Sequence, residues 1–293
     1  MLALSRRPKF SWATTRLQIE QLGSATAVLD AAYDGQLVDV ARDAEIAEAV
    51  SYIADLRSRG IHVSTLAGGD YPAALRTVHD APPVLYWQGE MSPADVNAVS
   101  IVGTRRPSEG GESFARGLAR LLAESGVPVV SGLARGIDSV AMRSALSAGG
   151  RTVGVIGTGH GVYYPKENAG LQEDIASSHL LLSQFTPGTA PSKHTFPMRN
   201  VVMSGFSSAT VIAEAGETSG TRIQARAAVK HGRPLVLSEN VARSRAWAQD
   251  LLESGYDVSV AATADEAFAL VMTLHRRRDA AAGGNPFGAL LSV

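Results

Sequence analysis

An alternation of strand-like and helix-like segments begins at Asn97 and continues to Arg278, and it leaves few folds open to the chain. The strand-like runs are almost continuously apolar, as strands covered on both faces are. Repeated alternation of this kind predicts an α/β fold with a doubly wound, mostly parallel sheet. The predicted strands cover residues 98–103, 127–133, 151–159, 179–185, 208–215, 233–239 and 256–262. The predicted helices cover residues 113–125, 139–149, 167–178, 221–232, 245–254 and 264–278.

The first 60 residues lack this alternation and have a helical pattern instead. Four apolar residues between Ile46 and Leu56 recur at the spacing of one helix face. Gly23-Ser24 is suited to end one helix and to cap the next. We therefore predict three parts: a small helical N-terminal module at residues 1–65, an α/β domain at 66–278 and a disordered tail at 279–293.

Composition narrows the class of protein. A content of 45% hydrophobic and 19% charged residues is typical of a soluble globular protein. The absence of cysteine excludes disulfides, thiolate metal sites and a cysteine nucleophile. No apolar run reaches the roughly 18 residues of a membrane span, and the N-terminus lacks the order of a secretory signal, so we expect a cytoplasmic protein with no membrane partner. The seven histidines show no metal-ligand spacing, and we expect no metal site.

The basic residues gather in the middle of the chain. Residues 100–235 hold 14 Lys and Arg against 9 Asp and Glu, whereas the rest of the chain holds 13 against 19. A local basic patch on a nearly neutral protein is the expected footprint of a confined site for a phosphate backbone. The alternative is an uneven scatter of surface charge.

Glycines and basic residues follow most of the predicted strands. The first strand is followed by Gly103, Thr104, Arg105 and Arg106, and a helical pattern begins near Gly111. In a doubly wound sheet, ligands bind outside the carboxyl ends of the strands, where helix N-termini attract anions. Guanidinium groups bind phosphate through a planar fork of donors. These turns predict a site for phosphate-bearing ligands, unless the two arginines are simply solvated.

The segment 193–200 has a different composition, because it places cations beside an aromatic ring. Lys193, Phe196, Arg199 and Asn200 lie within eight residues at a predicted helix start. A cation with an exposed aromatic ring is typical of single-stranded nucleic acid binding, in which the cation meets phosphate and the ring stacks on a base. The alternative makes Phe196 a core residue, with Pro197 in the first helical turn.

The sequence shows no complete motif for a nucleotide enzyme. No GxxxxGK[ST] motif occurs, and GTGHG at residues 157–161 is not GxGxxG because Val162 stands in place of the last glycine. Carboxylates at strand ends are Asp138, Glu214 and Glu217, which are either a catalytic group or structural caps and ion-pair partners. We therefore expect neither a cofactor nor an enzymatic activity.

Seven segments between residue 70 and about residue 235 resemble, in order, the DNA-processing protein A family (DprA, also called Smf). They are DYPAALRTVHDAPPVLYWQG, SIVGTRRPS, VVSGLARGIDSVAMRSAL, TVGVIGTGHGVYYPKEN, LLLSQFTPGT, FPMRNVVMSGFS and EAGETSGTRIQARAAVKHGRPL. The resemblance implies an extended Rossmann-like domain that binds single-stranded DNA and forms a homodimer. It also implies assistance in loading a RecA-type recombinase during recombination and natural transformation, without enzymatic activity.

The resemblance also implies particular contact residues. The implied DNA and phosphate contacts are Gly103, Thr104, Arg105, Ser108, Arg135, Lys166, Lys193, Phe196, Arg199 and Asn200. A second phosphate loop is implied at Gly216, Ser219, Gly220 and Thr221. The chain departs from the family pattern at Val201 and at Ser238-Glu239, and we expect no winged-helix module after Asp279. A second hypothesis is therefore a binder or hydrolase of a nucleotide-derived ligand in the same strand-end pocket.

Overall fold

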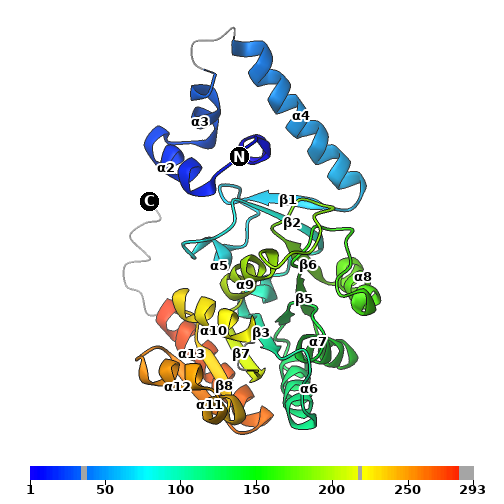
Figure 1. Cartoon of the computed structure of the whole chain (residues 1–293), viewed down its shortest axis with the longest axis vertical. Coiled ribbons are helices and arrows are strands. Elements are labelled where there is room, and N and C mark those ends of the chain that lie inside the picture. The colour runs from blue at the N-terminus through cyan, green and yellow to red at the C-terminus, as the bar shows by residue number, and fades with distance from the viewer. Residues whose placement is uncertain (34–37, 217–219, 284–293) are drawn as a thin grey trace.

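The computed structural model describes residues 1–33, 38–216 and 220–283. Its centre is a nine-stranded sheet in the order β1-β2-β6-β5-β4-β3-β7-β8-β9 (Figure 1). Strands β3 to β9 are parallel to one another, whereas β1 and β2 are antiparallel additions at the edge formed by β6. The predicted α/β class and mostly parallel sheet are therefore confirmed. The strands are β1 (His62–Thr65), β2 (Val84–Gly89), β3 (Val99–Gly103), β4 (Val129–Ser131), β5 (Thr152–Val155), β6 (Leu180–Ser183), β7 (Ala209–Glu214), β8 (Leu235–Ser238) and β9 (Val258–Ala261).

Helices cover both faces of the sheet, so the domain has three layers. One face is covered by α5 (Ala73–Arg76), α9 (Thr195–Phe206), α10 (Gly220–Lys230), α11 (Glu239–Ser244) and α12 (Ala246–Glu253). The other face is covered by α6 (Glu109–Glu124), α7 (Ile137–Ser147), α8 (Ala169–Ser178) and α13 (Ala264–Gly283). Successive strand residues point to opposite faces of the sheet. In β7, Ile212 packs with the helices of the first face and Val211 packs with those of the other face. This explains why these strands are apolar at nearly every position.

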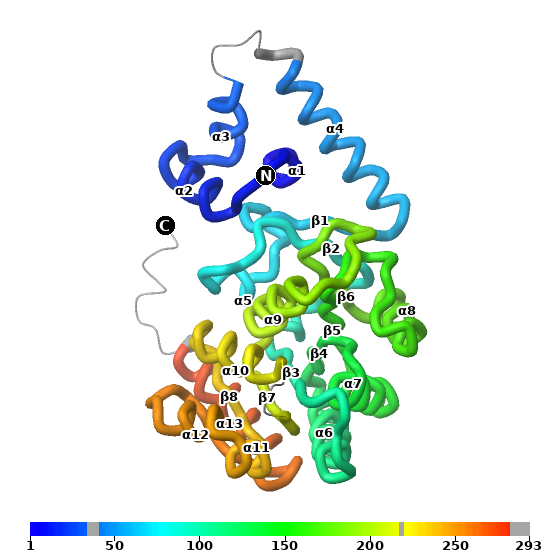
Figure 2. Tube along the Cα trace, in the orientation of Figure 1, coloured from blue at the N-terminus to red at the C-terminus, as the bar shows by residue number. Residues whose placement is uncertain are grey.

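The N-terminal segment forms the predicted helices at one end of the molecule, next to β1 and β2 (Figure 2). Ser24 accepts a hydrogen bond from the backbone of Ala27, and Gly23 ends the preceding helix in a left-handed conformation, as the sequence predicts. Leu56 is fully buried against β1 and β2, whereas Val50 is exposed. The helices are α1 (Leu2–Arg6), α2 (Trp12–Leu22), α3 (Ala25–Ala31) and α4 (Val38–Ser58).

Two features near the C-terminus differ from the sequence-based expectation. Ser238 caps α11, a short helix that the sequence pattern did not predict, by accepting a hydrogen bond from the backbone of Val241. Helix α13 extends through Gly283, so Asp279 lies in its last turns rather than at the start of a tail. The remainder of the expected tail, residues 284–293, lies outside the described residues.

Two 3-10 helices complete the described part of the chain. They are η1 (Pro93–Asn97), which precedes β3, and η2 (Lys166–Asn168), which precedes α8. Among the helices of the described residues, none combines the length and apolar character needed to cross a membrane.

Candidate nucleic-acid interface

The strand order reverses between β3 and β7. From β3 the chain moves to β4, β5 and β6 on one side, and from β7 it moves to β8 and β9 on the other. Such a reversal separates the connecting segments and opens a crevice at the carboxyl ends of the strands, where doubly wound folds bind ligands. A cavity of about 690 Å³ lies at this point. It is lined by the end of β3, the turn after it, and residues of α9 and α10.

A second cavity, of about 650 Å³, adjoins the first. Arg105, Ala134, Phe196 and Arg199 line both cavities, and we call the two together the strand-end groove. Of the predicted contact residues, the groove is lined by Gly103, Thr104, Arg105, Arg135, Lys166, Lys193, Phe196, Arg199, Asn200, Gly216, Gly220 and Thr221. Residues that are up to 118 positions apart in the sequence, Gly103 and Thr221, therefore meet in one place.

Ser108 does not line the groove. Its backbone N–H and its hydroxyl both donate to the Glu214 carboxylate, at 2.9 and 3.0 Å, and the hydroxyl oxygen accepts from the Gly111 N–H as the cap of α6. The Thr104 N–H also donates to the Glu214 carbonyl oxygen. Glu214 therefore holds the turn after β3 in place, and it already engages the N–H groups of Thr104 and Ser108, two of the implied contact residues.

The centre of the groove is an aromatic and cationic cluster. The guanidinium carbon of Arg105 lies 5.8 Å from the centroid of the Phe196 ring. The Tyr164 ring packs against the same Phe196 ring, with a centroid separation of 5.4 Å and an angle of 40° between the ring planes. Arg105 and Tyr164 are exposed, and Phe196 is half-buried. The cluster thus offers water-accessible ring surface next to a positive charge.

Sequence reasoning did not select Tyr164 or its neighbour Tyr163 as site residues. Both are exposed and both line the second cavity. The available signal was a pair of aromatic residues directly after a glycine-rich strand end, at Tyr163-Tyr164. Exposed tyrosines in such a position are candidates for stacking on bases.

Two glycines allow the groove residues to approach the sheet. A Cβ atom at Gly157 would lie 2.8 Å from the Phe196 ring, and one at Gly132 would lie closer still to the Arg199 guanidinium. Neither position has room for a side chain. The glycines after β5 and β4 therefore determine how deep Phe196 and Arg199 lie.

Arg199 forms part of the floor of the groove. It is 7% exposed, and its Nη1 donates to the carbonyl oxygen of Val155 at 3.0 Å. Burial lowers its pKa, while the nearby Asp138 opposes that change. Burial raises the pKa of Asp138, whose carboxylate accepts from the Gly132 N–H at 3.1 Å. Asp138 thus ties down the loop after β4 and does not cap α7, whose N-cap is Gly136.

The remaining cations lie at the rim. Lys166 and Lys193 are exposed, and Arg135 forms an ion pair with Glu167. This pairing lowers the pKa of Glu167 and offsets part of the Arg135 charge. Arg105, Lys166 and Lys193 are therefore the groove cations best placed to meet phosphate. The Ser219 and Glu217 positions lie outside the described residues.

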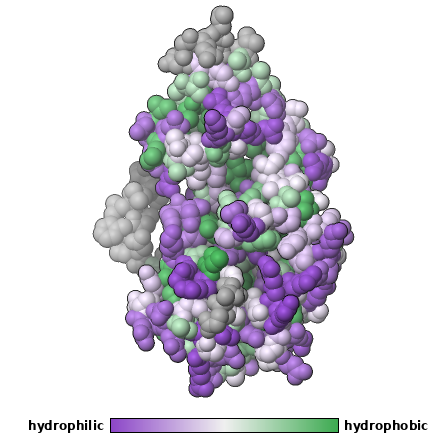
Figure 3. Space-filling view, viewed as in Figure 1, coloured by the Kyte–Doolittle hydropathy of each residue, from purple (hydrophilic) through white to green (hydrophobic). Residues whose placement is uncertain are grey.

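The surface shown in Figure 3 is mixed rather than broadly apolar. Hydrophobic residues form small separate patches among hydrophilic ones on this face. A large apolar patch is the usual sign of a protein or membrane contact. This face instead has the character of a surface that meets water or a polar ligand.

The three-layer fold defines a Rossmann-like α/β protein, and its basic, aromatic groove lies at the strand-order reversal, where such folds bind ligands. The chain belongs to the DNA recombination-mediator protein A family, whose profile matches residues 62–267.

Two curated relatives are similar over the same region. The DNA processing protein DprA of Bacillus subtilis is 37% identical over 182 residues, which is 62% of this chain and 61% of the relative. The DprA of Streptococcus pneumoniae is 40% identical over 163 residues, which is 56% of this chain and 57% of the relative. The chain thus matches somewhat more than half the length of these relatives.

Two solved structures are similar in fold. The X-ray structure of Streptococcus pneumoniae DprA gives a TM-score of 0.69 at 28% identity, and the match covers 87% of this chain and 92% of that one. A structure of Helicobacter pylori DNA processing protein A, which concerns its single-stranded DNA binding mode, gives a TM-score of 0.63 at 30% identity. That match covers 73% of this chain and 96% of the other.

Proposed function

We propose that the strand-end groove binds single-stranded DNA. The observation that carries this proposal is the cluster of Arg105, Phe196 and Tyr164, in which a cation and two accessible rings lie together. Single-stranded nucleic acid is held in this way, because cations meet the phosphates while rings stack on bases of any sequence. Lys166 and Lys193 extend the positive charge along the rim.

We further propose that this binding serves recombination, by assisting a RecA-type recombinase to load on DNA in natural transformation. In this proposal the chain acts in the cytoplasm as a homodimer. Membership of the recombination-mediator family and the single-stranded DNA binding mode of the Helicobacter pylori relative support the proposal.

The groove acts by binding rather than by catalysis in this proposal. The two strand-end carboxylates that the structure describes have structural partners: Asp138 is buried and accepts from the backbone of Gly132, and Glu214 holds Ser108. A general acid or base needs a carboxyl group that can reach the substrate. The structural engagement of these two groups supports a binding role.

A nucleotide-derived ligand is the second candidate. The first cavity, at about 690 Å³, has the size of a small-molecule site. Gly216, Gly220 and Thr221 line it at the start of α10, where helix N–H groups attract phosphate. A nucleotide would occupy the first cavity alone, whereas a DNA strand would also contact the second cavity.

Fluorescence anisotropy with a labelled oligo-dT of roughly 30 nucleotides tests the proposal. We expect Phe196→Ala to weaken binding about tenfold, because stacking contributes about 1–3 kcal/mol per base, and Arg105→Ala to weaken it severalfold. Arg106→Ala is the matched control, because Arg106 is an exposed arginine of the same turn that does not line the groove. The affinity of the Arg106→Ala variant for oligo-dT should remain within about twofold of the wild-type affinity.

Absence of binding at low salt, or an equal loss in the Arg106 control, would contradict the DNA proposal. A parallel thermal-shift screen distinguishes the second candidate, because a ligand that binds the folded state raises the Tm. A nucleotide that raises the Tm of a chain that fails to bind oligo-dT would support the nucleotide site.

A further inference from the structure

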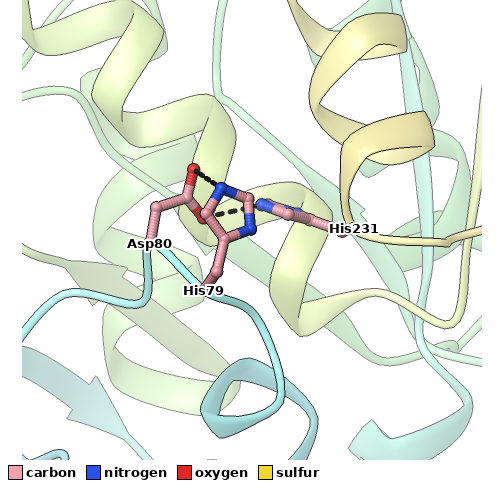
Figure 4. A group of neighbouring side chains, drawn as sticks. All are labelled: His79, Asp80 and His231. Carbon is pink, nitrogen blue, oxygen red and sulfur yellow. Dashed lines mark hydrogen bonds and ion pairs between the residues drawn. The ribbon is translucent and has the colours of Figure 1, made fainter.

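Three potential metal ligands meet outside the strand-end groove. His79 and Asp80 lie between α5 and β2, and His231 directly follows α10 (Figure 4). Their ligand atoms all lie within 4.8 Å of one another. Asp80 is 151 residues from His231 in the chain, which is why no metal-ligand spacing is visible in the sequence.

His231 is held in position before any ion binds. Its side chain is fully buried, its Nε2 lies 2.7 Å from Asp80 Oδ1, and its Nδ1 lies 3.0 Å from the hydroxyl of Ser204 on α9. A hydrogen bond to the second ring nitrogen is the feature that orients metal-binding histidines. In Figure 4 the His231 ring points at the Asp80 carboxylate, and the His79 ring lies on the same side of that carboxylate.

His79 is free to adjust. Its side chain is 55% exposed, and its Nε2 lies 3.6 Å from Asp80 Oδ2. The backbone of His79 is anchored by Arg16, whose Nη1 donates to the His79 carbonyl oxygen at 3.0 Å. The loop is thus fixed while the imidazole can rotate toward an ion and leave one coordination position to water.

We propose that His79, Asp80 and His231 bind one divalent transition-metal ion, with Zn²⁺ as the best fit. Two imidazoles and a carboxylate are a ligand set for zinc rather than for calcium or magnesium, which prefer oxygen. Donor atoms around a tetrahedral zinc ion lie about 3.3 Å apart. The distance is 2.7 Å from His231 Nε2 to Asp80 Oδ1 and 3.6 Å from His79 Nε2 to Asp80 Oδ2, which lie on either side of that value. All three ligand atoms lie within 4.8 Å of one another, so side-chain movements would complete the site.

The ion would act as a structural clip. It would join the loop before β2 to the end of α10, and through Ser204 to α9. The same two helices carry groove residues, including Phe196 and Arg199 on α9 and Thr221 on α10. Zinc would therefore stabilise the α9–α10 pair, and this inference does not depend on which ligand the groove binds.

Zinc titration of the untagged, chelator-treated protein in competition with a fluorescent zinc indicator tests this site. The chain has no cysteine, so thiolates do not compete for the ion. We expect one equivalent of Zn²⁺ per wild-type chain, and at least tenfold weaker affinity for His79→Gln, whose exposed side chain can be changed without disturbing the core. His62→Gln is the matched control, because His62 is an exposed histidine that stacks on Trp87 outside the cluster.

Thermal unfolding provides the second measurement. A hundredfold excess of zinc over its dissociation constant should raise the Tm of wild type by about 5 °C, and the same zinc concentration should raise the Tm of His79→Gln by about half of that or less. Lack of stoichiometric binding to wild type, or equal affinity in His79→Gln, would overturn the proposal. Equal weakening in His62→Gln would also overturn it, because zinc would then be binding to scattered surface histidines.

Discussion

At the scale of single residues, Phe196 has features of both environments that the sequence left open, the core and an accessible surface. One side of its ring packs over Gly157, as a core residue would, and the ring is only half-buried. Arg105 and Tyr164 approach the same ring. The residue is therefore anchored in the fold while it presents a surface to the groove.

His160 is a buried histidine whose surroundings favour the neutral form of its imidazole. It is 0% exposed, its Nδ1 lies 2.9 Å from the Gln88 side-chain oxygen, and its Nε2 has no hydrogen-bond partner. Burial lowers its pKa to about 4. The neutral imidazole is therefore the form that the folded protein accommodates.

This preference predicts a pH dependence of stability. Because the folded pKa of about 4 lies below the unfolded value of 6.5, stability from this group is present above pH 6.5. It is lost as pH falls from 6.5 toward 4, because the unfolded chain binds the proton more tightly. Between pH 7.5 and 5.5 the loss should be about 1 kcal/mol.

Urea unfolding of wild type and His160→Gln at the two pH values measures this contribution. The difference in the free energy of unfolding between pH 7.5 and 5.5 should be smaller in the variant by about 1 kcal/mol. The other histidines contribute equally to both proteins and cancel in the comparison. An identical pH dependence in the two proteins would show that His160 is not the group responsible.

At the scale of elements, Asp95 joins η1 to the residue that precedes β5. Its carboxylate accepts from the Ser92 N–H within a capping box and forms two hydrogen bonds with Arg151, at 2.7 and 2.9 Å. Arg151 also donates to the carbonyl oxygen of Glu90. One buried carboxylate thus fixes the entry of the chain into β3 against the start of β5.

Asp95→Asn should therefore destabilise the protein. We expect a loss of about 2 kcal/mol in the free energy of unfolding, because hydrogen bonds to charged groups contribute more than neutral ones and Arg151 loses its partner. The measurement is urea denaturation followed by circular dichroism.

Glu124→Gln is the control for Asp95→Asn. Glu124 pairs with Arg120 on the surface of α6, and both side chains are about half exposed. Exposed pairs contribute little, so the change should cost no more than about 0.5 kcal/mol. Similar losses in the two variants would argue against a special role for the buried pair.

At the scale of the whole molecule, the chain has a net charge of −1, but the strand-end groove is locally basic. Three of its rim and centre cations, Arg105, Lys166 and Lys193, are exposed. If each meets one phosphate, the logarithm of the DNA affinity should fall against the logarithm of salt concentration with a slope of about −2 per chain.

Lys193→Ala should reduce the steepness of this salt dependence by about 0.7, because one fewer counterion is released. Arg116→Ala is the control, because Arg116 is an exposed residue of α6 that does not line the groove. The affinities are measured by anisotropy at four or more salt concentrations. An unchanged slope for Lys193→Ala would remove that residue from the set of phosphate contacts.

The class of fold was predictable because hydrophobic periodicity is a local property. Each of the seven predicted strands overlaps one of β3 to β9, and the mostly parallel sheet is confirmed. Glycines and cations at the strand ends were equally visible along the chain, and these marked the edge of the sheet at which a site would form. The family followed from the same motifs.

Strand order and side-chain partners depended on contacts between distant segments, which no local pattern encodes. Packing placed β3 beside β7, which brought Arg105 to Phe196 and allowed Glu214 to engage Ser108. Burial also distinguishes two cations that are close in sequence: Arg199 is buried in the floor of the groove, whereas Lys193 is exposed at its rim. Only the folded structure decides this, because a charge removed from water needs partners inside the protein. The cluster of His79, Asp80 and His231 likewise exists only in the folded chain, where two loops far apart in sequence meet.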